Sequence, residues 1–517
     1  MADSREIERK YAVTNETPIP PLESLPGVAR IEPPVVFLLE AVYFDTAEFA
    51  LVEHGITLRR RTGGDDAGWH LKLPVPALPV PALPVSSEER TELHEPVGTD
   101  PEFVPARLRR AVAVHVRGRT LRPVASVSTK RTVRRLLGPK DEVLGHFCDD
   151  GVESERLDSS PLTRSWREWE LELVDGDSSL LDAADSLFAA VGASRSDSPS
   201  KLAQALGKPE PGLDSPTPPA PPTPLSPGSA GELLVTALRD YRRQLLVQDP
   251  RVREELSEAV HRMRVAVARI RAAINTFGPL VSDEAQSRLR PELGWMGHTL
   301  GAARDAEVMT ARFGPLLRSE PSDLVLGPIG ARMQQQFELD AQEARSALHD
   351  SLDSARYFRL LDDIDTLCSG AQLTSRAESR AKAAMPELVN NGIASLRQAM
   401  HSADTTRGPH AHDLALHEVR KEAKRVRYAA VLISPLRPKR TKRLAKIATA
   451  VQDALGAHQD SVVARQALLR LSAEAENAGE ATFSYGRLHA IEQSRGEDSE
   501  ADYERILRRI PKSLDTA

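Results

Sequence analysis

The sequence predicts an α+β protein with an antiparallel β-domain followed by an all-α domain. The chain has 517 residues, more than the roughly 100 to 250 that one domain usually holds. Short segments of alternating polarity fill residues 1–207, whereas long helical patterns rich in Ala, Leu, Arg and Glu fill residues 229–517. Between them, residues 208–228 are rich in proline and too poor in apolar residues to form a core. We expect this segment to be a linker.

Composition excludes several classes of protein. The net charge is -6 and 27% of residues are charged, so no overall basic field favours nucleic acid. Cys148 and Cys368 are the two cysteines and form no CxxC pair, which disfavours a disulfide framework or a cysteine zinc site. No run of about 18 apolar residues occurs. We therefore expect a cytoplasmic protein with no membrane and no nucleic-acid partner.

The first half carries strands with one charged face each. Residues two apart share a face of a strand, so Glu6, Glu8 and Lys10 point the same way, as do Glu168, Glu170 and Glu172 opposite Trp169. The cationic faces hold Arg59 and Arg61, Lys72, Arg90 beside Glu92, and Arg131 and Arg135. Any one of these faces is more typical of a solvent-facing sheet. Taken together, they predict about eight strands closed into a barrel with the charges inside.

Such a lumen suits a chain of phosphates. Arg and Lys bind phosphate oxygens, and carboxylates hold Mg²⁺ or Mn²⁺, which polarises a phosphoryl group or activates water. Three adjacent carboxylates repel one another unless a cation lies among them. The sequence therefore indicates a metal and phosphate site in the β-domain.

The ordered segments EIERK, YFDT, GITLRRR, WHLKL, RTE, CDDG, REWELEL and SPSKLAQAL resemble the CYTH family of triphosphate tunnel metalloenzymes across residues 1–207. The resemblance implies an eight-stranded antiparallel tunnel that cleaves triphosphates with Mg²⁺ or Mn²⁺. It implies catalytic roles for Glu6, Glu8, Lys10, Glu170 and Glu172, and metal ligation by Glu6, Glu8, Glu168, Glu170, Glu172 and Asp149. The triphosphate ligands that it implies are Lys10, Arg59, Arg61, Lys72, Arg90, Glu92, Arg131, Arg135 and Lys201.

Two features depart from that family pattern. His94 stands where many members have a carboxylate, which lowers the negative charge and would retune metal binding. A proline insertion at residues 73–85 follows the Lys72 strand. Because proline lacks the N–H that a sheet ladder needs, we expect a loop there, which would lie at a tunnel mouth or have no role.

The second half contains a duplicated basic helix. His261, Arg264 and Arg271 recur as His417, Arg420 and Arg427, displaced by 156 residues (261 to 417), and each set shares one helix face. Lys424 in the second copy corresponds to Ala268 in the first. The later segments LGAARD (300–305) and LGAHQD (455–460) repeat as well. We expect a duplicated helical bundle.

Side by side, the two helices would form one cationic groove. Arg269 and Arg425 would broaden it, and so would the run RPKRTKRLAK at 437–446. The paired H-x-x-R motifs resemble the CHAD family, which implies binding of inorganic polyphosphate and association with polyphosphate granules. The groove residues would be His261, Arg264, Arg269, Arg271, His417, Arg420, Lys424, Arg425 and Arg427. Alternatively, both histidines lie in the core, satisfied by carboxylates such as Asp305 or Asp460.

These features favour hydrolysis of inorganic triphosphate or short polyphosphate, with the helical domain holding polyphosphate. The alternatives are a non-catalytic polyphosphate-binding scaffold, or an activity like that of a class IV adenylate cyclase or a thiamine triphosphatase. A nucleic-acid groove is disfavoured because aromatic residues do not alternate with the basic ones. The sequence does not define the preferred chain length, the metal or the oligomeric state.

Overall fold

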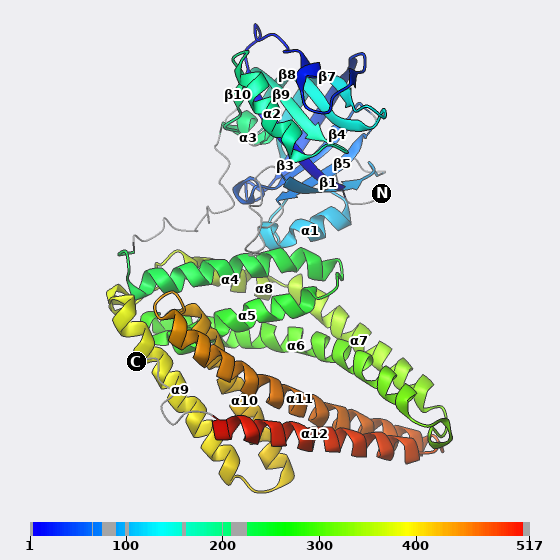
Figure 1. The fold of residues 1–517 in the computed structure, drawn as a ribbon, viewed down its shortest axis with the longest axis vertical. Coiled ribbons are helices and arrows are strands. Elements are labelled where there is room, and N and C mark those ends of the chain that lie inside the picture. The colour runs from blue at the N-terminus through cyan, green and yellow to red at the C-terminus, as the bar shows by residue number, and fades with distance from the viewer. Residues whose placement is uncertain are drawn as a thin grey trace. The chain divides into compact units, whose positions relative to one another are not determined.

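The computed structural model describes residues 4–64, 66–74, 89–98, 103–157, 162–198, 200–207 and 225–509, and gives no side-chain description for residues 4–6 and 89. The insertion beyond Pro74 and most of the predicted linker thus lie outside the described residues. Contacts divide the chain into two compact units, Met1–Thr217 and Pro218–Ala517. Figure 1 shows strands in the first unit and long helices in the second.

Eight strands of the first unit pair in an antiparallel ring. They are β1 (Ser4–Val13), β6 (Glu89–Glu95), β5 (Gly68–Pro74), β4 (Thr57–Thr62), β3 (Val35–Asp45), β7 (Arg122–Leu137), β8 (Val143–Arg156) and β9 (Thr163–Leu173), in that spatial order. Two short strands, β2 (Arg30–Ile31) and β10 (Ser194–Arg195), attach to β7 and β1. The predicted antiparallel tunnel is confirmed.

β1 closes the ring because its two halves have different partners. Residues 4–7 pair with β6, and residues 8–13 pair with β9. Glu8 lies opposite Glu172 and Lys10 lies opposite Glu170 across the β1–β9 ladder. The opening motif and the carboxylate strand are therefore neighbours in space.

Helices cover the apolar outer faces of the barrel. Helix α1 (Ala106–Val116) places Leu108 and Val112 in one cluster with Leu58, Trp69 and Leu71 of β4 and β5. Helix α2 (Ser178–Ala189) places Phe188 against Tyr11, Phe147 and Trp169. Burying these aromatic side chains outside the barrel leaves the alternate, charged residues to face inward.

The helical unit repeats one arrangement of four helices. The first set is α4 (Ala230–Arg253), α5 (Ala259–Thr276), α6 (Asp283–Ser319) and α7 (Ile329–Leu352). The second set is α9 (Ala381–Thr405), α10 (Pro409–Leu432), α11 (Pro438–Asn477) and α12 (Phe483–Arg509), with α8 (Ala355–Cys368) between the sets. Each helix packs on the next in its set, and α5 contacts α10. The predicted duplication is confirmed, with the two basic helices side by side.

No helix in the described part of the chain is both long and apolar enough to span a membrane.

Candidate functional site

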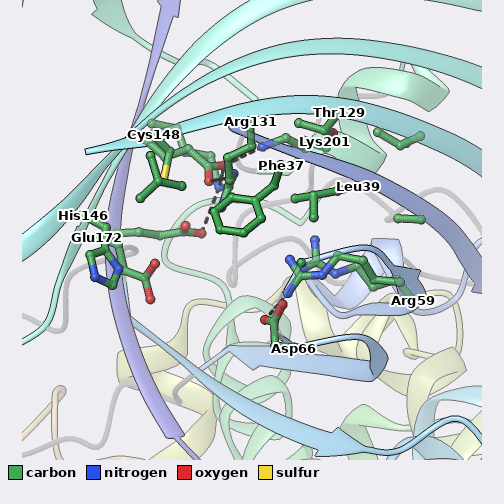
Figure 2. Close-up of a pocket in the computed structure, with 18 of the residues that line it drawn as sticks. Phe37, Leu39, Arg59, Asp66, Thr129, Arg131, His146, Cys148, Glu172 and Lys201 are labelled. Atoms are coloured by element: carbon green, nitrogen blue, oxygen red, sulfur yellow. Dashed lines mark hydrogen bonds and ion pairs between the residues drawn. The ribbon is translucent and has the colours of Figure 1, made fainter. Parts of the chain in front are cut away.

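A cavity of about 520 Å³ runs into the barrel. Most of the predicted tunnel residues line it, from six different strands and one helix: Glu8, Lys10, Arg59, Arg61, Lys72, Arg90, Glu92, Arg131, Arg135, Glu170, Glu172 and Lys201. Figure 2 shows Arg131 and Lys201 close to one another and Glu172 beside His146, with Arg59 across the space. The alternation of these strands places the listed side chains on the inner face of the barrel. Glu6 lies on β1, but its side chain is outside the described residues.

Glu170 is the centre of the charged network. The ammonium groups of Lys10 and Lys201 and the guanidinium of Arg131 all contact its carboxylate, Lys201 at 2.7 Å. Burial alone would raise the pKa of Glu170, but these three cations hold it well below its usual range. Burial likewise opposes ionisation of Glu8, yet Lys10 and Lys72 lower its pKa to about 2. Both carboxylates are therefore ionised at neutral pH.

The Asp149 prediction was wrong. Its carboxylate accepts from Arg167 at 2.8 Å and from the Trp169 indole at 3.2 Å, and Asp149 is not among the residues that line the cavity. The neighbouring Asp150 takes the inward position, is fully buried, and accepts from Arg131 at 2.9 Å. In the sequence FCDDG either aspartate could face inward. Asp149 lies opposite Trp169 in the β8–β9 ladder, and the Trp169 side chain points outward. Because cross-strand partners share a face of the sheet, this pairing shows that Asp149 points outward and Asp150 inward.

Lys201 lies among carboxylates. Its Nζ is 2.9 Å from Asp150, 2.6 Å from Glu168 and 2.7 Å from Glu170. These three carboxylates have oxygens within 4.8 Å of one another, which is metal-site spacing. The Lys201 ammonium fills the space between them, and neither Asp150 nor Glu168 lines the cavity, so these two carboxylates hold helix α3 (Lys201–Leu206) on the barrel. Glu168 also accepts from the Trp166 indole at 2.7 Å and does not line the cavity.

Carboxylates that face the cavity fit a hard divalent cation better. Glu8, Glu170 and Glu172 offer oxygen donors, which Mg²⁺ and Mn²⁺ prefer. Lys10 and Lys72, 3.0 and 4.0 Å from Glu8, partly balance that charge. Glu8, Glu170 and Glu172 are thus the residues that would hold a metal.

His94 does not line the cavity. Its ring packs on His70 with centroids 4.7 Å apart, and within the described residues neither of its ring nitrogens has a hydrogen-bond partner. Glu92 instead contacts the His70 Nδ1 at 2.8 Å. His94 is consequently not placed among the carboxylates that would hold a metal.

The helical unit gathers cations from α5 and α10. Burial, and then the guanidinium groups of Arg264, Arg420, Arg427 and Arg271, lower the pKa of Lys424 to about 8. Charges lower a neighbouring pKa in this way only at short range, so Lys424 and these four arginines lie close together in space. Arg264 also faces Asp305 at 3.6 Å.

Several other groove residues have protein partners. Arg269 lies near the rings of Tyr241 and Tyr428 and donates to Gln244 at 2.7 Å; its contribution to the groove stays a prediction. Arg425 pairs with Glu422 at 2.5 Å. His417 contacts the Gln459 side-chain amide at 2.9 Å rather than a carboxylate. His261 is half-buried near Arg304 and Arg264, and together with burial they lower its pKa.

Both units of the chain match models of known domain families. The model of the CYTH domain matches residues 4–206, and that of the CHAD domain matches residues 236–469. The uncharacterized protein Rv2226 of Mycobacterium tuberculosis is 36% identical over 532 residues, covering 98% of this chain and 97% of that protein.

Two solved structures are also similar. PptA from Streptomyces chartreusis is 24% identical, with a TM-score of 0.46, and covers 54% of this chain and 100% of its own. The CHAD domain from the plant Ricinus communis is 25% identical, with a TM-score of 0.45, and covers 58% and 98%.

Proposed function

Because this chain belongs to the family that joins a CYTH domain to a CHAD domain, we propose that its tunnel hydrolyses inorganic triphosphate and short polyphosphate with Mg²⁺ or Mn²⁺. We propose further that the helical domain binds polyphosphate and keeps the protein with it, including at polyphosphate granules. Hydrolysis in the tunnel and binding by the helical domain would thus concern the same class of molecule, inorganic polyphosphates.

One observation carries the enzymatic proposal. In a single cavity, the carboxylates of β1 and β9 lie among cations from β1, β5, β7 and α3. Arg59 and Arg61 of β4 line the same cavity, four strands around the ring from β9. A triphosphate bridged to a divalent cation needs both kinds of group, because its oxygens bind cationic side chains and the metal together.

The arginines of the cavity would bind the substrate, and the carboxylates would bind the metal. Arg59, Arg61 and Arg131 bind and orient the phosphates and neutralise charge that develops on the transferring phosphoryl group. Glu8 and Glu170, ionised and buried, would hold the metal; when bound, it polarises the phosphoryl oxygen or activates water. Closely spaced positive groups also keep the anionic substrate in a fixed pose.

Phosphate release tests the enzymatic proposal. Tripolyphosphate, ATP and long polyphosphate are compared with Mg²⁺, with Mn²⁺ and with chelator, and cyclic AMP is assayed with the ATP sample. Turnover of tripolyphosphate that requires metal is expected. Formation of cyclic AMP would instead indicate a cyclase, and no turnover of any substrate would leave a binding scaffold.

Two variants sharpen that test. Glu8→Gln keeps the size of the side chain but removes the charge, and we expect kcat to fall at least 100-fold. Glu153→Gln is the matched control, since Glu153 is exposed on β8 and is not a cavity residue. Equal losses in both variants would contradict the assignment.

The polyphosphate proposal depends on the convergence of Lys424 with four arginines. Changing Arg264, Arg420 and Arg427 to Ala should weaken binding and flatten its dependence on salt, because each phosphate contact releases counterions, as it does on nucleic acids. The exposed arginines 505, 508 and 509 of α12, changed together, provide the control. If the two triple variants bind polyphosphate equally well at the same salt concentration, the groove is not the polyphosphate site.

A further inference from the structure

Two residues that line the tunnel have side chains that the proposed hydrolysis does not use. His146 and Cys148 lie two residues apart on β8, and both line the cavity. Mg²⁺ and Mn²⁺ prefer oxygen donors, and phosphate oxygens prefer Arg and Lys. A nitrogen donor next to a sulfur donor is instead typical of a site for a softer divalent metal.

A carboxylate completes the set of donors. In the β8–β9 ladder His146 lies opposite Glu172, and Cys148 lies opposite Glu170. Cross-strand partners share a face of the sheet. Figure 2 shows Glu172 beside His146, with Cys148 on the same wall of the cavity. No CxxC pair marks this group in the sequence, because its members come from two strands.

Strand geometry brings the donors within reach of one ion. Phe147, between His146 and Cys148, is fully buried on the outer face in one cluster with side chains of α2, so its two neighbours point into the barrel. Same-face residues of a strand are about 7 Å apart and cross-strand partners about 5 Å, while zinc lies about 2.0 to 2.3 Å from each ligand atom. Within the described residues only the carboxylates around Lys201 already have metal-site spacing, so here side-chain rotation would close the donors on the ion.

The charge states of the group suit a metal. Burial and two nearby arginines lower the pKa of His146, so its ring is neutral at pH 7 and has a lone pair to donate. Burial and neighbouring carboxylates raise the pKa of the Cys148 thiol to about 12. Glu170 and Glu172 are among those carboxylates, so both lie close to the sulfur. A bound metal would displace the thiol proton and gain a thiolate ligand.

The two nearby arginines have carboxylate partners of their own. Arg131 contacts Asp150 at 2.6 Å and also contacts Glu170. Arg135 lies 3.7 Å from Glu32. Because these carboxylates offset both guanidinium charges, a thiolate and a further carboxylate can supply two negative ligands to a cation at this wall.

From this placement we propose that His146, Cys148 and Glu172 bind one Zn²⁺ ion. Three protein ligands that leave a fourth position open are the usual arrangement of zinc in a reactive cavity. The ion would withdraw Glu172 from the carboxylates that hold Mg²⁺ or Mn²⁺, so Zn²⁺ would inhibit the tunnel. The inhibition rests on the proposed function, whereas Zn²⁺ binding does not.

Co²⁺ tests the binding without any substrate, because a bond between Co²⁺ and a thiolate gives a charge-transfer absorption band in the near ultraviolet. The reduced full-length protein is titrated with Co²⁺, and Zn²⁺ or Mg²⁺ is then added. Stoichiometric Co²⁺ should produce the band. Zn²⁺ should abolish it, because thiolate ligands select zinc, and excess Mg²⁺ should leave it unchanged.

Two pairs of variants test the ligands. Cys148→Ser should abolish the band, with Cys148→Ala as a second variant if the first does not fold. Cys368→Ser is the matched control, since Cys368 is also buried but lies on α8 and does not line the cavity. His146→Gln should weaken Zn²⁺ binding at least about tenfold, because even the loss of an outer-shell partner costs about 10- to 100-fold. His94→Gln should not weaken it, because His94 does not line the cavity.

Inhibition gives a separate readout. Hydrolysis of tripolyphosphate is measured with Mg²⁺ at a free Zn²⁺ concentration fixed by a chelator, since the substrate itself binds metal. Zn²⁺ should stop turnover by the unaltered protein and by the Cys368→Ser protein. The Cys148→Ser protein should keep its Mg²⁺-dependent rate in the presence of Zn²⁺.

Each result has a defined meaning. The absence of a thiolate band with Co²⁺ overturns the proposal, and so does a band that the Cys148→Ser protein retains. Equal Zn²⁺ inhibition of the unaltered and Cys148→Ser proteins refutes the inhibitory role, because zinc would then act at the carboxylates alone. If no substrate is hydrolysed but the band depends on Cys148, the zinc site stands and the proposed hydrolysis fails. Turnover of tripolyphosphate by a protein that gives no band leads to the reverse conclusion.

Discussion

Lys424 should make the helical domain less stable than it would be without that charge. The ammonium is half-buried on α10. Burial and four neighbouring guanidinium groups lower its pKa from 10.5 to about 8. Each pKa unit corresponds to about 1.36 kcal/mol, so the protonated lysine would cost the fold about 3 kcal/mol before solvent screening and about 1 to 2 kcal/mol after it. Lys424→Met keeps most of the side-chain volume and removes this cost.

The effect has a definite dependence on pH. A lysine with a lowered folded-state pKa imposes its full penalty below about pH 8, where it is charged in both the folded and the unfolded state. Above pH 8 the folded protein releases the proton while the unfolded protein still holds it, so the penalty shrinks as the pH rises and disappears only above the unfolded-state pKa of 10.5. We expect Lys424→Met to raise the free energy of unfolding by about 1 to 2 kcal/mol at pH 7 and by progressively less as the pH rises from 8 to 10.5.

Urea unfolding followed by circular dichroism at a helix-sensitive wavelength measures this difference. Lys421→Met is the control, since Lys421 is exposed on the same helix and pairs with Glu418 at 2.7 Å. The same variant should bind polyphosphate more weakly, because a residue that opposes folding would contribute to the ligand site. A Lys424→Met protein no more stable than the Lys421→Met protein at pH 7 would refute the reasoning.

Three more predictions concern the barrel. Lys201→Met leaves the surrounding carboxylates without their buried cation, so the free energy of unfolding should fall by about 3 to 5 kcal/mol; a loss below about 1 kcal/mol in urea unfolding would contradict the structural role of the ammonium. Asp150→Asn should lower kcat/KM for tripolyphosphate more than tenfold because Arg131 loses one of its two charged carboxylate partners, whereas Asp149→Asn should change it less than threefold; the opposite ranking would restore Asp149 to the tunnel. Leu108→Ala, on the buried face of α1, should destabilise the β-domain by about 2 to 5 kcal/mol in thermal unfolding, and a near-neutral result would mean that α1 does not cover β4 and β5.

Strand alternation predicted the inward residues of β1 and β9 well because the opposite faces of these strands are buried against helix α2. Trp169 is fully buried beside Phe188, so the pattern of REWELEL left one orientation for Glu170 and Glu172. The same reasoning failed at Asp149, where two adjacent aspartates make the alternation ambiguous. Which of two equivalent carboxylates faces inward depends on the cross-strand neighbour, and a strand alone does not contain that information.

Other parts of the site required the three-dimensional structure. The β3 segment VVFLLEAVYFD is almost continuously apolar, so its sequence does not show that Phe37 faces the cavity and Leu38 faces outward. Lys201 was expected among phosphate ligands, yet three carboxylates from β8 and β9 surround its ammonium. In the helical domain, one helix face predicted the convergence on Lys424, but Arg269 lies one residue off that face, near the rings of Tyr241 and Tyr428. In each of these cases, contacts between residues far apart in the sequence determine where the side chain lies.

The division of β1 between two partners determines when the barrel can close during synthesis. β1 is the first strand to be made, but its partners β6 and β9 are residues 89–95 and 163–173. Residues 8–13 of β1 therefore lack their β9 partner until about a third of the chain has been synthesised, and contacts this distant in sequence form slowly. An unpaired strand is a template for wrong pairing. Because β1 is polar at every second residue, it stays soluble while it is unpaired. The alternation that forms the tunnel lumen thus also protects the nascent chain from aggregation.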